Sequence, residues 1–143
     1  MAAILNVTVP AAGTYVGPTY QVRLPSGVNP VMGAQATFTY GSGGTTVNAY
    51  LQTSFDGGQT WCDVISFTQF ALASARIVTN VVQAAVAPAA ATDGTLAAAS
   101  ANALFGGWWR VKYVVVGAYA ATTLRIDAFT NVGIVPAGAG ALG

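Results

Sequence analysis

The fold is decided by a nine-residue stretch, VNAYLQTSF, at positions 47–55. Val47, Ala49 and Leu51 would share one face of an extended chain, and polar side chains such as Asn48 would share the other, because successive side chains of a strand point to opposite sides. This alternation is typical of a strand in an antiparallel sheet that covers a core with one face. The stretch therefore predicts a half-buried β-strand.

Similar alternation recurs along the chain, in short runs rich in Val, Ile, Thr and aromatic residues. Further strands are expected at residues 4–9, 19–24, 34–40, 61–67, 75–82, 109–115, 124–129 and 132–135. Turns rich in glycine separate them at residues 25–27, 41–44, 56–58 and 117–118. Segment 84–103 is the exception, because it is rich in alanine. We expect a long connection there, with one helical turn near residues 96–103.

Short strands with one long excursion predict a single all-β domain over residues 1–143. The expected architecture is a two-sheet antiparallel β-sandwich, with jelly-roll topology preferred over an immunoglobulin-like one. Glycine, alanine and proline loosen both ends of the chain. A flexible N-terminal arm over about residues 1–18 and a C-terminal tail at 136–143 are therefore expected, each disordered or ordered by a neighbouring chain.

The charge inventory excludes several classes of function. Five Lys+Arg and four Asp+Glu give a formal net charge of +1, only 6% of the residues are charged, and there is no histidine. Because no catalytic triad, zinc site or phosphate-binding loop is recognisable, we expect no enzyme activity, metal or cofactor. The basic residues are dispersed, which argues against nucleic-acid binding. The single cysteine, Cys62, cannot form an intrachain disulfide.

Membrane insertion is not expected, although 54% of the residues are hydrophobic. A spanning helix needs about 20 nearly unbroken apolar residues, and the best candidate, residues 84–107, contains Pro88, Asp93 and Asn102. The N-terminus lacks the charged region of a secretion signal. A surface this poor in charge is a solubility liability for a free monomer, so we expect other subunits to cover part of it.

A turn motif follows the first stretch, in the sequence SFDGGQTW at positions 54–61. It resembles the Asp-box of sialidases and of many unrelated β-proteins, with Ser54, Asp56, Gly58, Thr60 and Trp61 at the motif positions. In such a turn the aspartate accepts hydrogen bonds from the turn's own amides, and the tryptophan packs beneath it. We expect a structural turn, because the motif occurs once and lies away from the catalytic site in sialidases.

The sequence WWRVKY at positions 108–113 places two tryptophans side by side. Neighbours in a strand face opposite ways, so we expect Trp109 to point into the core and Trp108 to point outward or to a strand edge. An outward Trp108 fits ordinary packing, a subunit contact, or stacking on a sugar ring beside Tyr119.

Charged residues mark the polar faces of two late strands. Arg110 and Lys112 share one face, and Arg125 and Asp127 share another. If these strands form a hairpin through residues 117–121, cross-strand contacts between arginine and aspartate follow. The residues expected at an interface are Ile4, Leu5, Val7, Trp108, Arg110, Lys112, Tyr119 and Arg125.

Two longer stretches, YLQTSFDGGQTW at 50–61 and WWRVKYVVVGAYAATTLRIDAF at 108–129, resemble capsid cement, or decoration, proteins of tailed bacteriophages. That family includes the jelly-roll cement protein of a Bordetella phage. Chain length, the bias toward alanine, glycine and threonine, and the scarcity of charge are also similar.

The resemblance implies a non-enzymatic virion protein, made in the host cytoplasm and bound to the capsid exterior. Its partners would be the major capsid protein, whose subunits it bridges, and itself, as a dimer or trimer at symmetry axes. The alternative is a carbohydrate- or receptor-binding β-sandwich module of a phage tail or fibre, with Trp108, Tyr113 or Tyr119 as its stacking platform.

Overall fold

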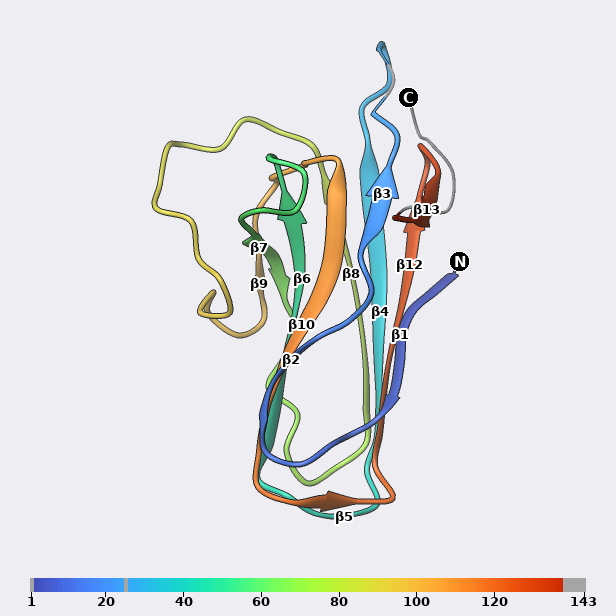
Figure 1. Cartoon of the computed structure of the whole chain (residues 1–143), viewed down its shortest axis with the longest axis vertical. Helices are drawn as coiled ribbons and strands as arrows, with labels where there is room; N and C mark the ends of the chain where they lie inside the picture. The colour runs from blue at the N-terminus through green and yellow to red at the C-terminus, as the bar shows by residue number, and fades with distance from the viewer. Residues whose placement is uncertain (1, 25, 138–143) are drawn as a thin grey trace.

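The computed structural model describes residues 2–24 and 26–137, and all regular structure within them is β-strand (Figure 1). The strands are β1 (Ala2–Thr8), β2 (Gly13–Val16), β3 (Tyr20–Val22), β4 (Val31–Thr39), β5 (Ser42–Gly43), β6 (Thr46–Ser54), β7 (Cys62–Ser66), β8 (Ala75–Val82), β9 (Ser100–Ala101), β10 (Trp108–Val116), β11 (Tyr119–Ala120), β12 (Thr123–Thr130) and β13 (Ile134–Pro136). Among these described residues there is no helix long and apolar enough to span a membrane.

The strands form two principal antiparallel sheets that pack face to face. One has the order β1-β12-β4-β8, and the other has the order β13-β3-β10-β6-β7-β9, with β2 also paired to β10. The chain passes between the sheets at one end of the molecule, where β5 and β11 pair (Figure 1). The predicted all-β antiparallel two-sheet sandwich is confirmed.

The core lies between the sheets and is built from the alternating apolar faces. In β4 and β10 every second side chain is buried, as their period-two sequences require. Trp109 points inward, as expected, and has no exposed surface. Its Nε1–H donates to the carbonyl oxygen of Gly106 at 3.0 Å, which satisfies the polar end of this buried ring.

The expectation of a flexible arm over about residues 1–18 is wrong for the part that the structure describes. Strand β1 pairs with β12, and β2 pairs with β10. Ile4 and Leu5 are only 2% and 4% exposed, because burying their apolar side chains stabilises the sheet more than leaving them in water. Of the tail at 136–143, Pro136 ends β13, the Ala137 amide donates to the Thr19 carbonyl, and the remainder lies outside the described residues.

Two local expectations are also wrong. Residues 96–103 contain no helical turn, and β9 pairs with β7 there. Strands β10 and β12 do not form a hairpin, since they belong to different sheets. Gly117, with φ of 85°, begins the crossing to β11, and a Cβ there would lie 2.7 Å from the Thr45 amide nitrogen. The chain therefore bends away from β10 at a position that only glycine fits.

Candidate functional site

The turn at 54–61 is held together by Asp56. Its Oδ1 accepts hydrogen bonds from the amides of Gln59 (3.1 Å) and Thr60 (2.8 Å) and from the Ser54 hydroxyl (2.8 Å), and Oδ2 accepts one from the Thr60 hydroxyl. These bonds, the Thr60 hydroxyl first among them, lower the pKa of Asp56 to about 2. The carboxylate is thus engaged on both oxygens by its own turn, which gives it a structural role.

The other motif residues complete the turn. Gly57 and Gly58 have φ of 73° and 90°, which glycine adopts without strain. The Trp61 Nε1–H donates to the Gly58 carbonyl oxygen at 3.1 Å. The Arg110 guanidinium carbon lies 4.4 Å from the centre of a Trp61 ring, a cation–π contact that joins the turn to β10.

Arg110 also belongs to a polar cluster on the outer face of the larger sheet, formed by Gln52, Asp63, Asp93, Arg110 and Lys112. The Arg110 Nε–H donates to Gln52 Oε1 at 2.8 Å. The Gln52 amide donates to Asp63 Oδ1 at 2.9 Å and to Asp93 Oδ1 at 2.6 Å, and Lys112 Nζ donates to Asp93 Oδ1 at 2.9 Å. The cluster therefore connects three strands to the long segment that contains Asp93.

Asp63 is the anchor of this cluster. Its side chain is on β7, and the residue is only 1% exposed. Oδ2 accepts hydrogen bonds from the amides of Gly94 (2.8 Å), Thr95 (3.1 Å) and Leu96 (3.1 Å). One buried carboxylate thus holds three successive amides of the alanine-rich segment against the sheet, since each amide prefers an anionic acceptor once it leaves water.

Asp93 completes the attachment from the segment's side. Partial burial raises its pKa, but the hydrogen bonds from Gln52 and Lys112 and the charges of Lys112 and Arg110 outweigh burial and lower it. The Asp93 side chain is half exposed, so its ion pair with Lys112 is weaker than a buried one. Asp63 rather than Asp93 is the residue on which the attachment depends.

The attached segment covers a groove of about 610 Å³ that lies beside the turn. Its apolar lining includes Phe55, Trp61, Val86, Pro88 and Leu104. Cys62 also lines it, is buried, and has its pKa raised first by burial and then by the charges of Asp63 and Asp93. The sequence pattern did not predict this arrangement. The one signal in the sequence was Asp63, an acid at a position in the strand expected at 61–67 where the alternation predicts an apolar residue.

The residues expected at an interface do not form one surface. Ile4 and Leu5 are core residues, which corrects their assignment, and Val7 packs against the same core. Trp108 is half-buried and pairs in register with Ser54. Arg110 and Lys112 belong to the polar cluster on the larger sheet.

The other two candidates lie elsewhere. The Tyr119 hydroxyl donates to the Ala71 carbonyl at 2.9 Å, and its ring packs edge-on against Phe38. Arg125 lies on the smaller sheet and pairs with Asp127 on the same strand at 3.1 Å. Trp108 begins β10 and Tyr119 follows its far end, so the two do not form a shared stacking platform.

Large apolar side chains are exposed at many places on the described surface. They are Val16, Leu24, Val28, Phe55, Leu72, Val78, Val82, Val86, Val116 and Phe129. Single exposed apolar residues are ordinary, but together with only 6% charged residues they leave the described surface rich in apolar and poor in charged side chains. No family model, curated protein or solved structure matches the chain.

Proposed function

We propose that this chain is a non-enzymatic virion structural protein, a cement protein that binds the outside of a bacteriophage capsid and bridges its major capsid subunits. The observation that carries the proposal is the apolar and nearly uncharged described surface, with Phe55, Val78 and Phe129 among its exposed residues. Association covers such a surface and gains free energy in proportion to the apolar area that it removes from water.

The acidic side chains bind groups of the same chain, which supports a scaffold role. Asp56 is hydrogen-bonded within its turn, Asp63 holds three backbone amides, and Asp127 pairs with Arg125. Side chains fixed in this way stabilise the sandwich and the segment attached to it. A rigid body with few charged side chains on its faces suits a protein that bridges subunits of a shell.

The sequence resemblance supplies the partners in this proposal. They are the major capsid protein and further copies of the chain, arranged as a dimer or trimer at symmetry axes. In this proposal, which the resemblance supports, the protein is made in the host cytoplasm and binds the capsid exterior. Neither nucleic acid nor membrane is a partner in this proposal.

The test is cosedimentation of the purified chain with empty capsid shells of the phage that encodes it, with copies per particle counted by mass spectrometry. A fixed ratio to the major capsid protein is expected. Absence from the shells, or a few copies confined to the tail, would refute the cement role and favour a receptor-binding module. The chain would then be screened for glycan binding, with Trp108 as the residue to substitute.

The binding face can be mapped in the same assay with single substitutions of exposed apolar residues. Phe55→Ser and Phe129→Ser change side chains on different parts of the fold, at the 54–61 turn and on β12. Each variant should melt as the wild-type chain does, because neither residue is buried. The variant that lowers binding identifies the face that contacts the shell, and the other serves as its control.

A further inference from the structure

The sheets have one long and regular open edge among the strands that the structure describes, and it is β8. The opposite edge of the same sheet, β1, has a bulge between Ala3 and Leu5. In the larger sheet the outer strands are short, since β2 has four residues, β13 has three and ends at Pro136, and β9 has two. Strand β8 pairs over eight residues with β4 without a register shift. Folded proteins usually protect such an edge by bulges, prolines, lysines or short strands.

The main-chain groups of alternate β8 residues point to this open edge. The hydrogen bond from the Gln83 amide to the Pro30 carbonyl fixes the phase of the ladder with β4. In an antiparallel pair only alternate residues bond to a given neighbour, so the odd-numbered residues of β8 bond to β4. The N–H and C=O groups of Arg76, Val78 and Asn80 therefore point away from the sheet, where no described strand pairs with them.

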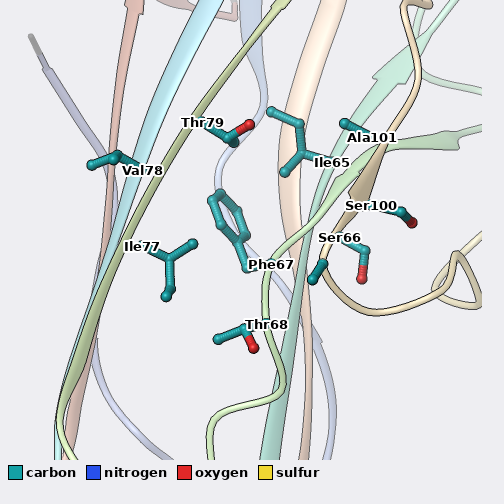
Figure 2. Close-up of a pocket in the computed structure, with 10 residues that line it drawn as sticks. Ile65, Ser66, Phe67, Thr68, Ile77, Val78, Thr79, Ser100 and Ala101 are labelled. Carbon is teal, nitrogen blue, oxygen red and sulfur yellow. The ribbon is translucent and has the colours of Figure 1, made fainter.

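The side chains of β8 follow the same alternation. Val78 is 64% exposed, and Ile77, Val78 and Thr79 all line a cavity of about 270 Å³ between β8 and the β7–β9 edge of the other sheet. Figure 2 shows Ile77 on the side of Phe67 and Val78 pointing away from it. A strand added beside β8 would thus extend the smaller sheet at the open side of the sandwich.

We propose that β8 is the pairing site for β8 of a second copy of this chain, so that two four-stranded sheets join into one continuous antiparallel sheet. A two-fold axis midway between the two copies of Val78 sets this residue opposite its own copy and sets Arg76 opposite Asn80. The only charge on the strand then faces a neutral amide that can accept its hydrogen bond. The Gln35 side chain already holds the Arg76 guanidinium at 2.9 Å, which orients it on the outer face.

The sequence of β8 explains why a second copy fits this edge. The strand contains no glycine, proline or lysine and four valines or isoleucines, which favour pairing. The net charge of +1 creates little repulsion between copies. This self-pairing does not depend on binding to a capsid, so it is tested with the purified chain alone.

The first experiment measures the mass of the chain by sedimentation equilibrium over a wide concentration range. A monomer–dimer equilibrium is expected for the wild type. Val78→Lys sets two like charges opposite each other at the axis and should weaken dimerisation roughly ten-fold or more. Phe55→Lys, at an equally exposed site outside β8, is the matched control and should dimerise as the wild type does. A monomeric wild type, or a dimer that Val78→Lys leaves unchanged, would overturn the proposal.

The second experiment tests the register by cysteine cross-linking. Residues opposite each other in a hydrogen-bonded antiparallel pair have Cα atoms about 5.5 Å apart, a distance that a short bis-maleimide reagent spans. Val78→Cys should therefore be cross-linked between two copies by this reagent, and Val82→Cys should not, because the axis places residue 82 opposite residue 74. Cross-linking through residue 82 alone would refute this register. Both residues are exposed, so neither substitution disturbs the core.

Discussion

Replacement of Asp63 by asparagine should detach the alanine-rich segment from the sandwich while keeping the shape of the side chain. The carboxylate has two acceptor oxygens. Oδ1 accepts from Gln52 at 2.9 Å, and Oδ2 accepts from three amides at 2.8–3.1 Å, with the Gly94 amide shared between the two oxygens. Asparagine offers one oxygen and one NH₂ group. Either the Gln52 amide or the backbone amides must then face a donor, which cannot accept their hydrogen bonds.

The cost follows from these bonds. A hydrogen bond to a charged group contributes about 1.5–3 kcal/mol, and a neutral one about 1 kcal/mol. Changing three amide bonds from charged to neutral removes about 0.5–2 kcal/mol for each bond, or roughly 1.5–6 kcal/mol in all. Relief from burying a charge offsets part of this loss, because Asp63 is almost wholly buried. The free energy of unfolding should therefore fall by about 2–3 kcal/mol for Asp63→Asn.

Three measurements check this prediction. Urea unfolding gives the change in stability. Elastase cleaves after alanine, so the rate of cleavage reports whether the alanine-rich segment, residues 84–103, has detached from the larger sheet. A thiol reagent reports exposure of Cys62, which lines the groove that the segment covers. Because burial raises the pKa of Cys62, labelling of the wild type should be slow at neutral pH. The variant should be cleaved and labelled faster than the wild type.

Asp93→Asn is the matched control, since it neutralises the other acid of the polar cluster. The Asp93 side chain is half exposed, so its loss should cost less than about 1 kcal/mol. The segment would remain attached through Asp63. The reasoning is refuted if Asp63→Asn changes stability by less than about 0.5 kcal/mol, or if the two variants are equally sensitive to elastase.

Three further predictions follow from the structure. Gly106→Ala should lower Tm by roughly 5–10 °C, because a Cβ there would lie 2.2 Å from a main-chain oxygen of β6, whereas Gly107→Ala meets nothing within 4 Å and should melt as the wild type does. Asp56→Ala should lower Tm above about pH 4, and this effect should disappear as the pH falls through about 2. The hydrogen bond from the Thr60 hydroxyl is the largest of the causes that lower the pKa of Asp56 to about 2, and the stabilisation exists only while the folded carboxylate is ionised. A Tm difference that is constant with pH would contradict this explanation. Association of the chain, measured by sedimentation at low and high NaCl, should weaken little with salt, because screening acts on charges; a steep loss would show that ion pairs drive it.

Strands were predictable from the sequence because each one carries its own alternation. Residues 75–82 were expected as a strand and form β8 with the same bounds, and Trp109 was expected to point inward and has no exposed surface. The pattern does not say which strands pair. Strands β10 and β12 are close in sequence yet belong to different sheets, because the crossing depends on Gly117 and on the distant β5.

The polar cluster was not predictable for a related reason. Asp63 interrupts an apolar alternation, and its partners Gly94, Thr95 and Leu96 lie about thirty residues further along in a segment without periodicity. Sequence spacing carries no information about such contacts. A strand was expected at residues 4–9 and β1 forms there, but its loose surroundings in sequence suggested a flexible arm and concealed that Ile4 and Leu5 complete the core.

The four acids of the chain show why its contacts with a partner molecule should be made by backbone and apolar groups. Asp56 is bound within its turn, Asp63 and Asp93 hold the alanine-rich segment, and Asp127 pairs with Arg125. Each carboxylate is therefore committed to a group of the same chain. What the fold offers to a partner is exposed valine and phenylalanine and the open main-chain edge of β8. Such groups bind through burial and backbone hydrogen bonding, which suit stable and close-packed assembly better than charge-steered, transient encounter.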